Sequence, residues 1–321
     1  MNDLIHIDRA GIRSQFPKVK SYLKAYFLGP AKWDEKELMR LKRYAKGDKF
    51  SFTYSPEFDH SAYTFSTACT DLGCISMAKY WHAIHGALKQ EYGWRTYWQQ
   101  AVAYAFWSDV MDIKWHFHSL DEFNRGKRPQ RLKTIFLDTL GWHIADCLIL
   151  GWTDLAIHLS KLAYQAMDND LFNDAGDAFG RRRTQHFILR LISDWQGWNI
   201  CPIAKCAHDE PLFNLLINHW REPNVDKLVP LLLAVCDRHT HQAHFDTSRE
   251  FFDLGHYEQF YDPYEILSVF RLRELIGLSN PVLDHPLMKT PLAQLPPVSE
   301  PYVDELLTGI LSHARQEFPG L

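Results

Sequence analysis

The sequence predicts an all-α protein, an array of antiparallel αα-hairpins that forms one large helical domain behind an irregular N-terminal segment. Three observations predict this class. From about Ser66 onward, apolar residues recur almost without interruption at the 3.6-residue period of an α-helix. Capping residues stand where the periodic stretches begin, and glycines stand where they end. The links between stretches are about two to six residues long, which favours antiparallel neighbours.

The first 65 residues are the least regular, so residues 1–65 and 66–321 are the expected divisions of the chain. One or two short helices are expected before residue 66, and the charged stretch 34–49, which ends near Gly47, is one of them. Residues 50–65 alternate aromatic with polar side chains and contain Pro56, which predicts a loop or a short strand. The later expected helices are 71–92, 94–118, 130–150, 154–171, 181–197, 210–221, 225–243, 263–277 and 300–317.

Individual residues mark the expected helix ends. The predicted N-caps, whose side chains would accept hydrogen bonds from first-turn amides, are Thr153, Asp209, Asn224, Asp262 and Ser299. The glycines expected to stop helices are Gly93, Gly151, Gly197 and Gly277. Residues 137–167 therefore form a helical hairpin that turns at Gly151.

Composition limits the class and the compartment. The chain has 321 residues with 46% hydrophobic and 14% aromatic content, which is typical of a globular protein with a sizeable core. A net charge of −4 argues against a nucleic-acid partner, because such a protein needs clustered cations. No apolar run approaches the roughly 20 residues that span a membrane, and the start lacks a secretory pattern. Six scattered cysteines predict free thiols, so we expect a cytoplasmic protein.

The predicted helix 94–118 is apolar nearly all round, which favours a central, buried position. Its aromatic residues are expected in the core, and its acidic residues Asp109 and Asp112 are expected to pair with Arg or His. The 11 tryptophans of the chain would build a homodimer face as readily as a core. A homodimer is therefore a second possible association.

The stretch "CDRHTHQAHFD" (236–246) contains His239, His241 and His244 and raises the question of a metal site. Three or four such side chains must converge to hold a metal ion. His241 and His244 share a helix face, but no fourth ligand stands at helical spacing. Histidines in the last turn of a helix also complement its negative end, and this interpretation predicts no metal and no cofactor.

An all-helical, metal-dependent hydrolase stays open as the alternative function. It would use the cluster 239–244 or the pair His208–Asp209, with His186 and either Asp237 or Asp253 completing a site that activates water. Asp209 also has a simpler role, as the N-cap of the next helix.

Residues 245–265 ("FDTSREFFDLGHYEQFYDPYE") link two expected helices and have an unusual composition. Six carboxylates stand against one Arg, together with seven aromatic residues, and the segment is long for a passive connection. Aromatic anchors and acidic side chains are typical of a surface that binds a basic partner. The predicted partner-binding residues are Asp246, Glu250, Phe252, Asp253, Tyr257, Glu258, Tyr261 and Asp262.

The text from Asp262 onward, "DPYEILSVFRLRELIGLSNPVLDHPLMKTPLAQLPPV", resembles the C-terminal signature of helical immunity proteins encoded beside bacterial polymorphic toxins, the PoNi-like group. The likeness covers roughly 130–297. Its matching positions are Pro263, Glu265, Ile266, Arg273, Gly277, Leu278, Asp284, His285, Pro286 and Leu287. The resemblance implies a cytoplasmic protein without enzymatic activity that binds a cognate toxin domain and occludes its active site. Such toxins are often nucleases delivered by contact-dependent or type VI secretion.

Overall fold

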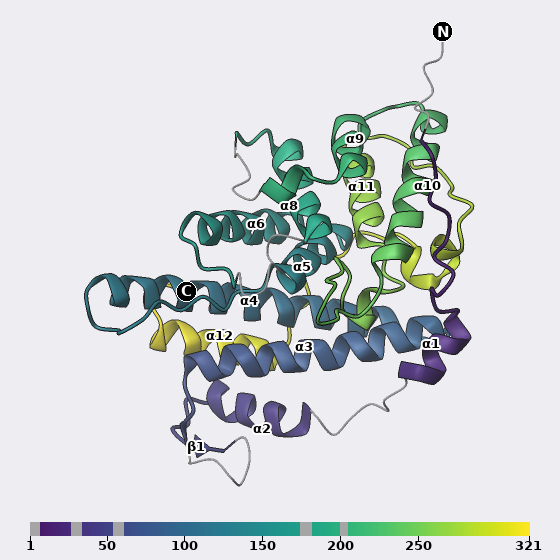
Figure 1. Cartoon of the computed structure of the whole chain (residues 1–321). Coiled ribbons are helices and arrows are strands. Elements are labelled where there is room, and N and C mark those ends of the chain that lie inside the picture. Colours follow the sequence, from purple (N-terminus) through teal and green to yellow (C-terminus); the bar gives the residue numbers. More distant parts are fainter. Residues whose placement is uncertain (1–6, 27–33, 54–60, 174–181, 200–204) are drawn as a thin grey trace. The chain divides into compact units, whose positions relative to one another are not determined.

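A computed structural model describes residues 7–26, 34–53, 61–173, 182–199 and 205–321. The chain is all-α, as the sequence predicts: most of the described residues are helical, and the strands of the described part form one small sheet (Figure 1). In that part of the chain, no helix is both long and apolar enough to cross a bilayer.

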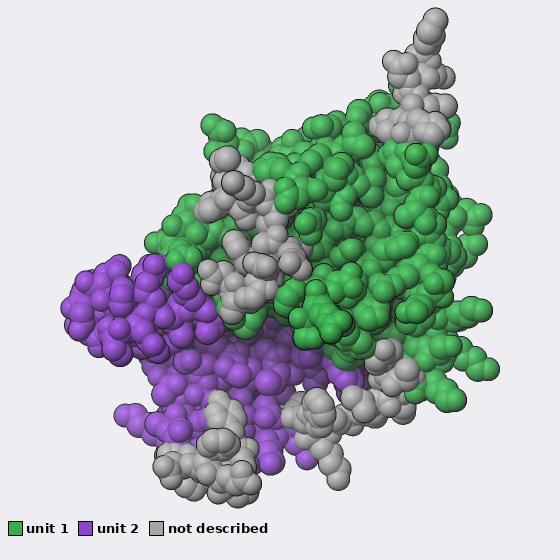
Figure 2. Space-filling view, viewed as in Figure 1, with its two compact units in different colours: residues 1–27, 84–92, 136–300 green, residues 28–83, 93–135, 301–321 purple. Residues whose placement is uncertain are grey.

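The chain divides into two compact units, shown in different colours in Figure 2. Unit 1 comprises Met1–Phe27, Ile84–Tyr92 and Phe136–Glu300, and unit 2 comprises Leu28–Ala83, Gly93–Ile135 and Pro301–Leu321. The sequence predicts a boundary at residue 65 with one helical domain after it. The two units divide the chain differently, because each contains three separate stretches of it. Segments far apart in the sequence therefore pack together within each unit.

Unit 1 contains most of the helices. They are α1 (Val19–Tyr26), α5 (Leu137–Ile149), α6 (Thr153–Asp168), α8 (Arg183–Gln196), α9 (Pro211–His219), α10 (Val225–Gln242) and α11 (Tyr264–Leu275). Short 3-10 turns are η2 (Lys205–His208), η3 (Tyr257–Gln259), η4 (Pro286–Lys289) and η5 (Pro291–Ala293). Unit 2 contains α2 (Asp34–Ala45), β1 (Ser51–Phe52), β2 (Ser61–Ala62), α4 (Trp94–Asn124) and α12 (Glu305–Glu317). Helix α3 (Phe65–Leu88) begins in unit 2, and its last residues belong to unit 1.

The caps were predicted with mixed success. Asn224 is confirmed, because its side chain accepts from the Asp226 amide. The prediction for Asp209 is wrong, since the neighbouring Glu210 carboxylate accepts from the Leu212 amide instead. The other three were also wrong: the N-caps of the helices concerned are Trp152, Pro263 and Asp304.

Helix α5 is the centre of unit 1, with nearly all of its residues buried. It packs against α6, α8 and α11, and the predicted hairpin with α6 is confirmed. Gly151 makes the turn at a φ of 82°, a conformation that glycine adopts at little cost. Gly141 lets α8 approach closely, because a β-carbon there would lie 2.6 Å from Cβ of Gln185.

Unit 2 joins the beginning of the chain to its last helix. Helix α2 packs against α12, and the Tyr44 hydroxyl donates to the Glu317 carboxylate (2.8 Å), 273 residues later in the sequence. Within the same unit, the buried Arg40 guanidinium binds both oxygens of Asp71 at 2.8 and 2.6 Å.

The aromatic residues of α4 are mainly core residues, as predicted. Of the ten tryptophans in the described part of the chain, none is exposed. Asp112 has the predicted histidine neighbour, with His116 Nδ1 at 3.5 Å, but its side chain is 41% exposed and therefore lies at the surface.

Candidate functional site

The three histidines of the cluster 239–244 have separate partners in unit 1. Both ring nitrogens of His239 face oxygen atoms, Nδ1 toward Glu265 Oε1 (2.8 Å) and Nε2 toward a backbone carbonyl (3.2 Å). His241 donates to a carbonyl of the N-terminal segment (3.0 Å), and His244 donates to the carbonyl of the next residue (2.9 Å). Within the described residues, no three His, Cys, Asp or Glu side chains converge as metal ligands would.

The residues of the alternative hydrolase site are likewise engaged separately. Asp237 binds Arg9 and His285, whereas Asp253 binds Arg238 and the start of α8. His186 lies buried on α8. The structure therefore gives each of the two proposed aspartates its own cation.

The predicted partner surface 245–265 is largely internal. Five of its eight predicted binding residues are buried: Phe252 (5% exposed), Asp253 (1%), Glu258 (3%), Tyr261 (4%) and Asp262 (4%). Tyr257 is half-buried, and Asp246 and Glu250 are exposed. The prediction is wrong for the buried five, because their aromatic rings pack into unit 1 and their carboxylates are enclosed by other segments.

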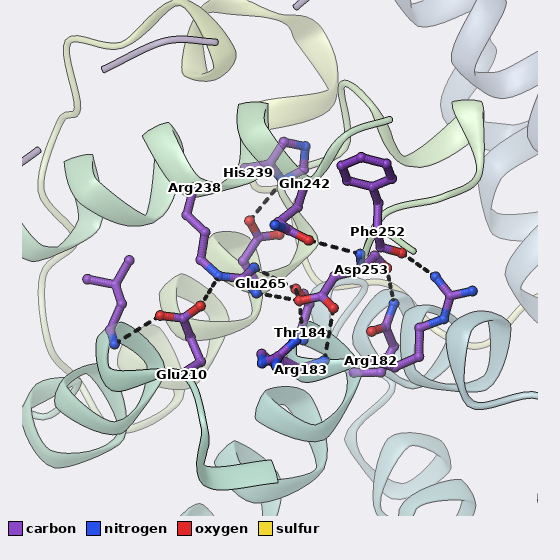
Figure 3. Close-up of polar contacts among 12 residues, drawn as sticks. Arg182, Arg183, Thr184, Glu210, Arg238, His239, Gln242, Phe252, Asp253 and Glu265 are labelled. Carbon is purple, nitrogen blue, oxygen red and sulfur yellow. Dashed lines mark hydrogen bonds and ion pairs between the residues drawn. The ribbon is translucent and has the colours of Figure 1, made fainter. Parts of the chain in front are cut away.

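Asp253 is the centre of a buried polar network (Figure 3). Its Oδ1 accepts from the Arg183 amide (3.1 Å), and its Oδ2 accepts from the amide and the hydroxyl of Thr184 (3.2 and 3.1 Å). These amides belong to the first turn of α8, where unpaired N–H groups and the helix dipole attract an anion. A carboxylate from a distant loop therefore caps α8.

Arg238 on α10 joins this cap to a second carboxylate. Its guanidinium pairs with Asp253, donates to Glu210 Oε2 (2.6 Å) and to the Thr184 hydroxyl (3.0 Å), and stacks over the Phe213 ring. Burial alone would lower the pKa of Arg238, but the two carboxylates outweigh it and raise that pKa above its ordinary value. Helices α8 and α10 and the loop before α11 are thus held by one charged cluster.

Arg182 fixes the loop from its other side. Its guanidinium donates to the carbonyl of Phe252 and to Oδ2 of Asp246 (2.8 Å). Asp246 in turn accepts from the Phe252 amide at 2.7 Å. The exposed tip of the loop, residues 245–250, is therefore carried on an internally braced base.

A second buried cluster lies at the start of α11. The Trp142 indole donates to Asp262 Oδ2 (2.8 Å), beside the His239–Glu265 pair. Burial raises the pKa of Asp262 to about 7, although the Trp142 hydrogen bond and His239 oppose the rise. This carboxyl group keeps its proton at a pH where an exposed aspartate has lost it.

We expect Asp262→Asn to become more stable relative to the native chain as the pH rises. Because the folded-state pKa is raised above the unfolded value, the native carboxyl contributes its full stability only below about pH 4 and loses it as the pH passes about 7. The neutral amide keeps an acceptor for Trp142 and has no such loss. Urea unfolding at pH 5.5 and 8.0 measures the difference in unfolding free energy between variant and native chain. A difference independent of pH contradicts the assignment.

Several residues of the C-terminal signature have structural roles in unit 1. Arg273 is fully buried and donates to three carbonyls, those of Trp220 (2.6 Å), Glu222 (2.8 Å) and Ser279 (2.6 Å). His285 accepts from the Leu287 amide through Nδ1 (3.2 Å). The signature therefore coincides with residues that hold α11 and the following segment in place.

No pattern in the sequence predicted that the N-terminal segment would bind Asp237 of α10. Arg9 Nε and Nη2 bind the two carboxylate oxygens of Asp237 at 2.9 and 2.8 Å, and the Gly11 amide donates to the same group (3.0 Å). Burial alone would raise the pKa of Asp237, but these donors outweigh burial and lower that pKa below its ordinary value. The partners are 228 residues apart, and Arg9 lies in a stretch without periodicity, so no local pattern connects them.

Comparisons with known proteins add no relative. No family model matches the chain, and neither a curated protein nor a solved structure matches it.

Proposed function

We propose that the protein is an immunity protein that binds a cognate bacterial toxin, a nuclease effector, and occludes its active site. One observation carries the proposal: the positions of the signature are positions on which the fold depends. Glu265 binds His239 of α10, Arg273 binds the segment after α9, and His285 binds Asp237 of α10. A likeness in residues that join helices supports a common helical scaffold, and the mode of action is proposed on the exposed surface that this scaffold carries.

The exposed tip 245–250 is the surface that we assign to the toxin. It presents Phe245 (37% exposed) and the carboxylate of Glu250, whereas the Asp246 carboxylate is held by Arg182 and the Phe252 amide. A nuclease site is basic because it holds phosphate, so acidic side chains on an inhibitor are attracted to it. Bracing by Arg182 and Asp253 lowers the conformational entropy that the tip loses on binding.

The test is co-expression with the polypeptide encoded beside this gene in its own genome. We expect the native chain to restore growth and to form a complex with that polypeptide in pull-down assays. Phe245→Ala with Glu250→Lys is expected to weaken the complex at least about ten-fold. Because the Phe245 ring also packs against that of Phe260 (centroids 5.3 Å apart), circular dichroism verifies the fold of the variant before binding is measured.

Glu305→Lys is the matched control, since it makes the same charge change at an exposed position of unit 2. It is expected to leave protection intact. Full protection by the double variant would exclude the tip as the contact. Failure of the native chain to bind the neighbouring gene product or to protect against it would overturn the proposed function.

A further inference from the structure

The segment 7–16, which we call the N-terminal strap, lies along α10 in unit 1 (Figure 1, dark purple). It has neither helix nor strand, and most of its residues are exposed. At its C-terminal end, the ring of Phe16 packs against the ring of Tyr261, with the two ring centroids 5.2 Å apart. The rest is held mainly by polar contacts.

These contacts come from one face of α10. Asp237, Thr240 and His241 are spaced i, i+3 and i+4, so their side chains project on the same side. We call this face the strap site. Its members offer a carboxylate, a hydroxyl oxygen and a ring N–H, and a backbone carbonyl of α10 also faces the strap.

Each group of the strap site recognises one part of an Arg-x-Gly-x-Arg peptide. The Asp237 carboxylate receives the two-pronged Arg9 guanidinium and the Gly11 amide. His241 Nε2 donates to the Gly11 carbonyl (3.0 Å). The amide of Arg13 donates to the Thr240 hydroxyl (3.1 Å), and its side chain donates to the His241 carbonyl (2.9 Å).

Two further features make this arrangement specific. Gly11 has a φ of 72°, so any other residue would be strained at this position. Asp237 is completely buried, and His285 Nε2 lies 3.2 Å from its Oδ1. Arg9 of the strap forms an ion pair with this carboxylate, and the Arg9 side chain is 40% exposed.

We infer that the strap site is a docking site for an arginine-bearing segment of a partner protein, and that residues 9–13 occupy it in cis. A partner segment with the pattern Arg-x-Gly-x-Arg would make the same hydrogen bonds and displace the strap at little net cost, because the strap buries few apolar side chains. This inference goes beyond the proposed function and does not depend on which protein the partner is.

The test uses the full chain and a labelled peptide with the sequence of residues 7–18, IDRAGIRSQFPK. We expect the chain carrying Arg9→Ala and Arg13→Ala to bind this peptide at least ten-fold more tightly than the native chain does. In the native chain the strap competes at a high effective concentration. Fluorescence anisotropy measures the binding, and circular dichroism verifies the fold of each variant.

Matched controls separate recognition from general charge attraction. Adding Asp237→Asn to the double variant is expected to weaken peptide binding at least ten-fold, whereas adding Asp226→Asn, at an exposed position in the first turn of α10, is expected to change nothing. A peptide with both arginines replaced by lysine is expected to bind weakly, because an ammonium group cannot form the fork. Binding that survives Asp237→Asn, or no binding to the well-folded double variant, overturns the inference.

Hydrogen exchange on the native chain gives a test that requires no variant. If the strap is displaceable, it opens without unfolding α10, so the amides of Gly11 and Arg13 exchange at least 100-fold faster than those in the middle of α10. Equal exchange rates mean that the strap opens only with the whole unit, and the inference then fails.

Discussion

Replacing Asp253 with asparagine is expected to lower the free energy of unfolding by about 3–5 kcal/mol. The substitution preserves size but removes the negative charge that Arg238 and the first turn of α8 share. Arg238 would remain buried with only Glu210 as a counter-charge. Removing one partner of a buried charged pair costs more than the pair contributes, because the remaining charge cannot regain its hydration.

Equilibrium urea unfolding followed by tryptophan fluorescence measures this loss. Glu250→Gln is the matched control, because it removes one carboxylate from the same loop at an exposed position, and it is expected to change stability by less than about 0.5 kcal/mol. Similar effects of the two variants would mean that Asp253 does not hold the network together.

Arg273→Met is expected to have a comparably large effect, a loss of about 3 kcal/mol or more. The methionine fills part of the same space but leaves three carbonyl groups in unit 1 without their shared donor. Each buried polar group left unsatisfied costs about 1–3 kcal/mol. Arg273→Lys is expected to fall between methionine and arginine, since an ammonium group cannot reach carbonyls of two separate segments with the geometry of a guanidinium.

The same urea assay applies, with Arg249→Met as the control. Arg249 is exposed, so we expect its loss to change the free energy of unfolding by no more than about 0.5 kcal/mol. A lysine variant as stable as the native chain would show that charge alone, rather than the planar fork, is required at position 273.

Local patterns predicted the helices well because each pattern is contained within one helix. The helix expected over 225–243 is α10 (Val225–Gln242), and that expected over 263–277 is α11 (Tyr264–Leu275). Helix α5 begins at Leu137 rather than at 130, and α3 begins at Phe65 rather than at 71. Hydrophobic period fixes the middle of a helix more firmly than its ends.

The candidate site was predicted poorly because its partners are far apart in the sequence. Asp253 appeared as one of many acidic residues in a loop, and nothing nearby indicated that Arg238 and the start of α8 would enclose it. A segment rich in acidic and aromatic residues can be a binding surface, and it can equally be a buried loop whose carboxylates bind distant arginines. Only the three-dimensional pairing distinguishes them, and it separates the exposed Glu250 from the buried Asp253.

The pairing of α2 with α12 has a consequence for synthesis on the ribosome. Tyr44 and Glu317 are 273 residues apart, and translation at roughly 5–20 residues per second separates their appearance by about 15 to 55 seconds. During that interval the apolar face of α2, with Leu41 and Tyr44, has no α12 to cover it. Unit 2 is therefore completed only after most of the chain has been translated.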